Sequence, residues 1–221
     1  MALKATHRPE LSRFFKTRPM IGRTLDGMTT TTVDLLKPVL ADLAVVVANT
    51  DGHETAPTPC TELDVAALRN HVAGWLSTFA AGFADPGGRA SASGAQVPQV
   101  AEQAAEVIRA AADQLDSAVR SGADQRPLYL GENPMPGDMA MSMILWEYIV
   151  HGWDLAVATG QEWNPAPEAA AASATFAPTM LTPDYQGPGK PFAPRVSTAE
   201  NASDLERLLG LSGRDPSWRR R

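Results

Sequence analysis

The chain of 221 residues is long enough to bury a sizeable core, and its 44% apolar and 20% charged residues are ordinary for a globular protein. A formal net charge of −6 argues against nucleic acid or an anionic membrane surface as the main partner. The single cysteine, Cys60, excludes an internal disulfide, and no apolar run approaches the roughly 18 residues of a transmembrane helix, so we expect a cytoplasmic protein.

Residues 1–27 differ from the rest of the chain because they are mixed basic and lack the apolar core of a signal peptide. We interpret them as a disordered N-terminal extension, or as sequence upstream of a start at Met28. Residues 28–221 are predicted to form a single helical domain with a C-terminal tail.

Helical spacing accounts for nearly every periodic segment, and no strand alternation is convincing. The first helix is predicted from about Asp34, its expected N-cap, to Ala48. A loop rich in proline and threonine follows, and the second helix begins after Asp64. Its apolar stripe consists of Val65, Leu68, Val72, Trp75, Leu76 and Phe79.

Two more long helices follow. The third is predicted to start near Pro98 and to run to about Ser121. After the loop RPLYLGENPMPGD, the fourth is expected to be capped by Asp138 and to end at Gly160, in the position that a C′ glycine prefers. Four such helices with polar loops between them predict an all-α fold, a four-helix bundle.

The C-terminal part is predicted as a short, partly irregular helical extension. A short alanine-rich helix is expected to begin at Asn164-Pro165, and Ser203–Leu211 has the pattern of a short amphipathic helix. We expect this extension to pack on the bundle or on a partner, which leaves both a monomer and a homodimer open.

Two of the four histidines, His71 and His151, lie inside predicted helices among core-type residues. Glu147 stands four residues before His151, so both side chains project from one helical face, and His71 could face them from the second helix. One carboxylate and two imidazoles suit Zn²⁺ or another first-row divalent metal with at least one position left open. Such a metal would also compensate the several kcal/mol that burying these groups costs.

Other interpretations of these residues remain open. A glutamate and a histidine four residues apart also occur as a surface pair or as a hydrogen-bonded core couple without metal. Asp154 is either an acceptor that orients a ligand histidine from behind or a solvated group near a helix end. Cys60 lies just before a helix N-terminus, where it either fills a small pocket or acts as a nucleophile.

The segments PTPCTELDVAALRNHVAGWL and ILWEYIVHGWDLAVATGQ resemble the metal-binding branch of the DinB-like superfamily, and the ending LERLLGLSGRDPSW is similar as well. This branch includes the N-terminal domain of mycothiol-dependent maleylpyruvate isomerase and related actinobacterial metal-binding proteins. The resemblance covers about residues 30–218 and implies a four-helix bundle that binds a divalent metal through His71, Glu147 and His151.

The resemblance also implies a function, the joining of a low-molecular-weight thiol such as mycothiol to an electrophile with Zn²⁺ as cofactor. We do not expect isomerase activity, because the isomerases carry a second domain for which this chain has no room. A metal-dependent binding or regulatory module without turnover is the alternative. A purely structural helical protein, in which Glu147 and His151 pair with each other or with His71, is a third possibility.

Overall fold

The computed structural model describes residues 24–25, 28–90, 100–190 and 192–220. The predicted N-terminal extension lies almost entirely outside these residues, as does Pro98, the expected start of the third helix.

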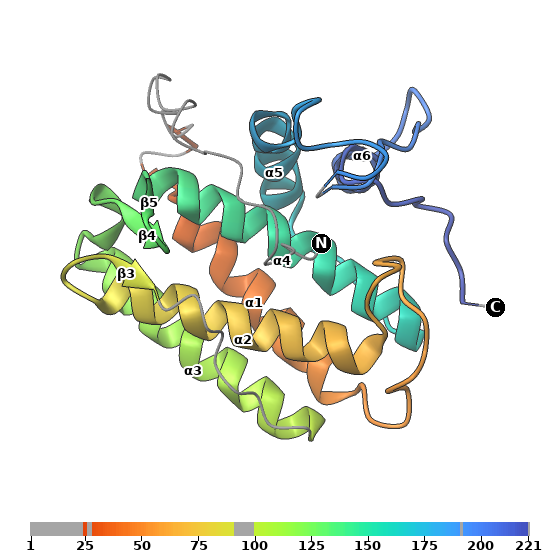
Figure 1. Ribbon diagram of the computed structural model, residues 1–221, viewed down its shortest axis with the longest axis horizontal. Coiled ribbons are helices and arrows are strands. Elements are labelled where there is room, and N and C mark those ends of the chain that lie inside the picture. The colour runs from red at the N-terminus through yellow and green to blue at the C-terminus, as the bar shows by residue number, and fades with distance from the viewer. Residues whose placement is uncertain (1–23, 26–27, 91–99, 191, 221) are drawn as a thin grey trace.

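The predicted all-α bundle is confirmed, and its four long helices are α1 (Thr32–Ala48), α2 (Val65–Ala84), α3 (Ala101–Arg120) and α4 (Gly137–Thr159). Helices α1 and α2 each pack against both α3 and α4, so α3 and α4 lie on opposite sides of the bundle (Figure 1). Their apolar stripes meet in one continuous core. Its largest fully buried side chains include Leu36, Leu40, Leu43, Leu68, Leu76, Phe79, Phe83, Ile108, Leu115, Trp146 and Tyr148.

Helix α4 is buried on nearly every side, which explains why its sequence lacks a polar face. The bundle covers one side of α4, and helix α5 (Pro167–Met180) covers another (Figure 1). Helix α6 (Asp204–Leu211) packs in turn on α5. Trp146 shows this layering: its ring contacts Phe176 and Phe192 of the C-terminal part, and its indole N–H donates to Ser212 Oγ at 2.9 Å.

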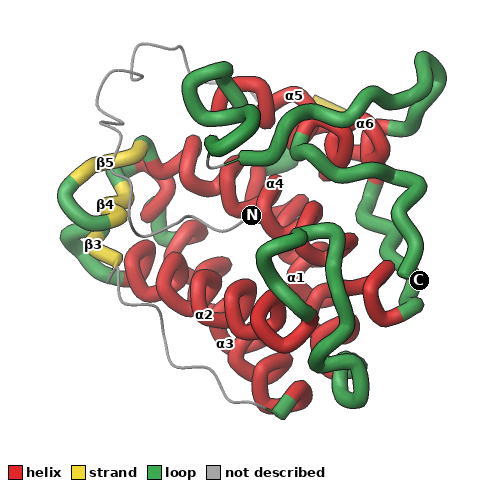
Figure 2. Tube along the Cα trace, turned by 45° about the vertical axis from the view of Figure 1, so that its right-hand side comes forward, coloured by secondary structure: helices red, strands yellow, loops and turns green. Residues whose placement is uncertain are grey.

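After α6 the chain runs along α4 toward the end of the bundle where the loop between α1 and α2 lies (Figures 1 and 2). Arg220 ends this path with hydrogen bonds to His53 of that loop, at 2.8 Å, and to the Ala158 carbonyl of α4, at 3.1 Å. The C-terminal segment, residues 161–190 and 192–220, is therefore tied to the bundle at its end by Arg220.

Several helix ends were predicted correctly. Asp64 caps α2 by accepting the Ala67 N–H at 2.8 Å, and Gly160 ends α4 at a φ of +74°, a conformation that glycine adopts without steric cost. The short amphipathic helix predicted over Ser203–Leu211 is α6, which ends at Leu211 as expected; its N-cap Ser203 forms a capping box with Glu206 that the sequence analysis did not predict.

Two predicted N-caps are wrong. The N-cap of α1 is Thr31, and Asp34 is its third helical residue, where the carboxylate accepts the Thr31 N–H at 3.0 Å. Helix α4 begins at Gly137, one residue before Asp138. A Cβ at Gly137 would lie 2.5 Å from the carbonyl oxygens of Asp124 and Arg126, so the helix starts where only glycine fits against the 3₁₀ helix η2 (Ala123–Gln125).

Other boundaries differ by a few residues. Helix α3 begins at Ala101, and α5 begins at Pro167, whose missing N–H and preset φ suit the first helical position, rather than at Asn164-Pro165.

Short strands are present where the sequence pattern indicates none. β4 (Leu128–Leu130) pairs in parallel with β3 (Arg89–Ala90) and antiparallel with β5 (Asn133–Met135), within the segment predicted as a loop. This small sheet lies at one end of the bundle, and β1 (Thr24–Leu25) pairs separately with β2 (Met28–Thr29) (Figure 1). Strands of two or three residues are too short to show a periodic pattern.

Among the described residues, none of the helices combines the length and the apolar character needed to cross a membrane.

Candidate metal centre

Helices α2 and α4 bring the three predicted ligands together. His71 projects from the second turn of α2, and Glu147 and His151 stand one turn apart on α4. Next to them, the Tyr148 hydroxyl donates to the Val72 carbonyl at 3.1 Å and so joins the two helices at the level of the cluster. Tyr148 is a supporting residue that the sequence pattern did not single out.

The ligand atoms of His71, Glu147 and His151 lie within 4.8 Å of one another. His71 Nε2 is 3.3 Å from Glu147 Oε1, and the two imidazole rings meet edge to face with centroids 5.2 Å apart. The Glu147 side chain is only 4% exposed and the His151 side chain 0%, whereas the His71 side chain retains 12% exposure. His71 is therefore the most exposed of the three residues.

Glu147 is a buried carboxylate whose negative charge is only partly compensated by hydrogen bonding. Burial alone would raise its pKa. His71 makes the largest opposing contribution, and the resulting pKa lies below its ordinary value, so the group is ionised. Its second oxygen, Oε2, is buried and has no hydrogen-bond partner among the described residues. An ionised oxygen of this kind, next to two imidazoles, fits a divalent cation.

The spacing of the cluster also fits a metal. Zinc holds nitrogen and oxygen ligands at about 2.0–2.2 Å, so ligand atoms around it lie roughly 3–4 Å apart. The separations observed here need only a small side-chain adjustment to reach that range.

His151 is oriented from behind by Asp154, a fully buried residue, so the solvated interpretation of Asp154 is wrong. His151 Nδ1 is 3.0 Å from Asp154 Oδ2. Burial lowers the pKa of His151 to about 3, so the imidazole is neutral at neutral pH. Burial alone would raise the pKa of Asp154, but Arg214 and His151 outweigh it and hold that pKa well below its usual range. A neutral imidazole beside an ionised carboxylate carries its proton on Nδ1, which leaves the lone pair on Nε2.

Arg214, in the segment after α6, completes this arrangement and was missed by sequence reasoning. Its Nη2 donates to Asp154 Oδ2 at 2.9 Å, and its Nε lies 3.3 Å from both carboxylate oxygens. The side chain is 5% exposed, and Asp154 beside it raises the pKa of the guanidinium although burial alone would lower it. The available signal was the GRDP motif within the ending LERLLGLSGRDPSW.

A second group of possible ligand atoms, from Cys60, His151 and Asp154, also lies within 4.8 Å and is fully buried. The Cys60 side chain lies against the Arg214 guanidinium, which already bonds both oxygens of Asp154. The guanidinium already places a positive charge beside these atoms. It would repel a metal ion, which could bind there only by displacing the guanidinium. The cluster of His71, Glu147 and His151 is therefore the better metal site of the two.

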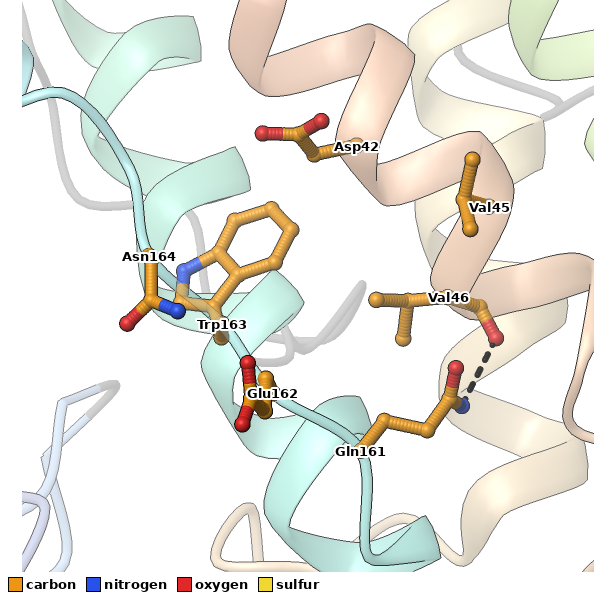
Figure 3. Close-up of a pocket in the computed structure, with 7 residues that line it drawn as sticks. All are labelled: Asp42, Val45, Val46, Gln161, Glu162, Trp163 and Asn164. Atoms are coloured by element: carbon orange, nitrogen blue, oxygen red, sulfur yellow. Dashed lines mark hydrogen bonds between the residues drawn. The ribbon is translucent and has the colours of Figure 1, made fainter.

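Trp75 lies beside the candidate centre, with its ring 6.5 Å from the His71 ring between centroids. A separate shallow pocket of about 470 Å³ lies between α1 and the segment after α4 (Figure 3). Its walls come from Asp42, Val45, Val46, Gln161, Glu162, Trp163 and Asn164, so it does not include the metal cluster. Cys60 is buried, in agreement with the pocket-filling interpretation.

Residues 36–156 match the model of the mycothiol maleylpyruvate isomerase N-terminal domain, a DinB-like family. The chain belongs to this family. The matched part includes His71, Glu147, His151 and Asp154, whereas Arg214 lies outside it.

Two curated relatives come from Mycobacterium tuberculosis, the uncharacterized protein Rv0738 of strain H37Rv and the uncharacterized protein MT0763 of strain CDC 1551. Each is 30% identical over 175 residues, which cover 77% of this chain and 91% of the relative. No solved structure matches the chain significantly.

Proposed function

We propose that this protein is a metal-dependent thiol S-transferase of the cytoplasm that joins a low-molecular-weight thiol, such as mycothiol, to a small electrophile. The observation that carries the proposal is the ionised Glu147, which lies beside the imidazoles of His71 and His151 and whose buried Oε2 has no hydrogen-bond partner within the described part of the chain. The family match supports mycothiol as the thiol, because the family is that of the mycothiol maleylpyruvate isomerase N-terminal domain.

His71, Glu147 and His151 would hold the metal, with Zn²⁺ as the expected ion, and Asp154 would orient His151. Three protein ligands leave a position for a further ligand, as in catalytic zinc sites. When bound, the metal would lower the pKa of a coordinating thiol from about 8.5, so that the nucleophile is ionised near neutral pH. The three residues then act as ligands and not as acids or bases. The 12% exposure of the His71 side chain, next to Trp75, marks the side from which the small molecules would approach.

The alternative function is a metal-dependent binding or regulatory module without turnover. The low exposure of the cluster favours it, because Glu147 is 4% and His151 0% exposed and a large substrate has little access.

The first experiment is the metal content per chain, by mass spectrometry, of protein purified without a nickel column. We expect about one divalent ion per wild-type chain and loss of that ion in His71→Ala and Glu147→Ala. His53→Ala is the matched control, since His53 belongs to the loop between α1 and α2 and lies outside the cluster. A metal-free wild type that takes up no zinc on incubation would contradict both functions and support a structural pairing of Glu147 with His71.

A conjugation assay then separates the two functions. The metal-loaded protein is mixed with mycothiol and a chromogenic aryl halide, and thioether formation is followed by absorbance. Turnover in the wild type and in His53→Ala, but not in His71→Ala, would support the transferase. One metal per chain without conjugation of any thiol and electrophile in a panel would support the binding module.

A further inference from the structure

Arg214 is held by structure that aims its guanidinium into the protein. The backbone N–H of Arg214 donates to the Leu209 carbonyl at 2.9 Å, and its side-chain Nη1 donates to the Ser212 carbonyl at 2.9 Å. The preceding Gly213 has a φ of +77°, and a Cβ there would lie 2.7 Å from the Ala193 Cβ. The turn therefore requires glycine, and the turn directs the arginine toward α4.

The guanidinium meets two other parts of the chain, the loop before α2 through Cys60 and helix α4 through Asp154. The Cys60 position is itself fixed, because the Thr58 hydroxyl donates to the Leu63 carbonyl at 2.7 Å and accepts the Cys60 N–H at 3.1 Å. Three segments that are distant in sequence thus converge on one buried positive charge.

Asp154 Oδ2 accepts a hydrogen bond from Arg214 Nη2 at 2.9 Å and lies 3.0 Å from His151 Nδ1. A carboxylate paired with a guanidinium stays an acceptor, so it fixes the neighbouring imidazole as the tautomer with its proton on Nδ1. This tautomer presents Nε2 as the lone-pair nitrogen, which is the form that a metal ligand needs.

We infer that Arg214 is a positioning residue of the metal centre: through Asp154 it sets the tautomer and the orientation of His151, so the C-terminal segment controls metal affinity. The part that concerns affinity rests on the proposed metal site, whereas the part that concerns the tautomer does not. Removing a carboxylate behind a ligand histidine typically weakens metal binding 10- to 100-fold. We expect Arg214→Met to weaken zinc binding by about the same factor, because it removes the group that holds the carboxylate.

The decisive measurement is ¹⁵N NMR of the histidine side chains in the metal-free protein. The His151 resonances are assigned by their loss in His151→Gln. In the wild type we expect the proton on Nδ1 of His151, and in Arg214→Met a mixture of tautomers or exchange broadening. Arg214→Lys keeps the positive charge without the planar fork, so it should restore the wild-type tautomer at least in part.

Zinc affinity is measured on the same variants by competition with a chromophoric chelator. Arg195→Met is the matched control: Arg195 also anchors the C-terminal segment, through Gln186 Oε1 at 2.8 Å and the Leu181 carbonyl at 3.0 Å. We expect Arg195→Met to leave the tautomer and the zinc affinity unchanged. If it lowers both as much as Arg214→Met does, then general docking of the segment, and not Arg214 itself, controls the site.

The outcomes separate this inference from the proposed function. A wild-type protein with the His151 proton on Nε2 would overturn the inference even if Arg214→Met failed to fold. Metal binding that is unchanged in a folded Arg214→Met would overturn it while leaving the metal site intact. A wild type that binds no metal would refute the proposed function, and the tautomers of wild type and variants would still test the role of Arg214.

Discussion

Replacing Gly152 by alanine is expected to destabilise the protein even though alanine is the better helix former. Gly152 lies within α4, directly after His151, and faces the indole of Trp163. A Cβ at this position would lie 2.7 Å from Trp163 Cε2 and closer still to Cζ2 and Cη2. Real Cβ atoms essentially never come so near, and Trp163 is only 7% exposed, so the ring has little room to move away.

The sign of the effect follows from two magnitudes. Glycine to alanine within a helix stabilises by up to about 1 kcal/mol. Inserting a methyl group into a well-packed core typically costs about 1–3 kcal/mol, and the contact with a rigid ring places this case at the upper end. We therefore expect Gly152→Ala to lower the free energy of unfolding by about 1–2 kcal/mol. Urea denaturation with chelator present, followed by far-ultraviolet circular dichroism, measures this difference without a contribution from metal.

A double-mutant cycle with Trp163→Leu tests the stated cause. The smaller side chain removes the indole atoms that the new methyl group meets, so in that background Gly152→Ala should be neutral or stabilising. The coupling energy should then be at least about 1 kcal/mol. The reasoning is refuted if Gly152→Ala is as stable as the wild type, or if it costs the same in both backgrounds.

Three further predictions concern single positions. Asp64→Ala should lose about 1 kcal/mol of stability in the same urea assay because it removes the N-cap of α2; an unchanged midpoint would contradict the capping role. Hydrogen bonds from Thr31 lower the pKa of Asp34 below 3.8, so its contribution to stability is present above that value and is lost as the pH falls through the lowered pKa. The stability gap between wild type and Asp34→Asn should accordingly shrink between about pH 7 and about pH 2, and a constant gap would be the contrary result. Cys60, 7% exposed, should react with iodoacetamide far more slowly in the native protein than in urea, as followed by mass spectrometry; equal rates would show that the loop opens readily.

The helices were predictable because local patterns determine them. The start of α2 after Asp64 and the end of α4 at Gly160 each depend on a residue type whose backbone or side-chain preference is strong. The start of α1 was misplaced because Thr31 and Asp34 form one reciprocal capping box, in which either residue alone resembles the cap.

The proximity of His71, Glu147 and His151 was partly predictable. The spacing of Glu147 and His151 follows from helix geometry, whereas the placement of His71 opposite them depends on how α2 packs on α4. Whether these residues hold a metal stays a prediction.

The role of Arg214 was not predictable from pattern, because it depends on a contact between residues that are far apart in the sequence. A lone arginine in a polar ending has the appearance of a solvated group, and Asp154 three residues after His151 has the same ambiguity. Arg214 and Asp154 can be buried because they form an ion pair with each other. The burial of either residue could therefore not be predicted without knowing its partner.

The family match ends at residue 156, but the buried charge network does not end there. Asp154 lies inside the match with 0% exposure, and its guanidinium partner lies outside it. Removing one partner of a buried ion pair typically costs about 3–5 kcal/mol, a large share of the 5–15 kcal/mol that stabilises an ordinary domain. Without the C-terminal segment, Trp146 would lose Ser212, Phe176 and Phe192 as well. The matched helices supply the candidate ligands, but the charge that keeps Asp154 ionised behind His151 comes from the segment that follows them. The structural unit that supports the site therefore includes the C-terminal segment through Arg214.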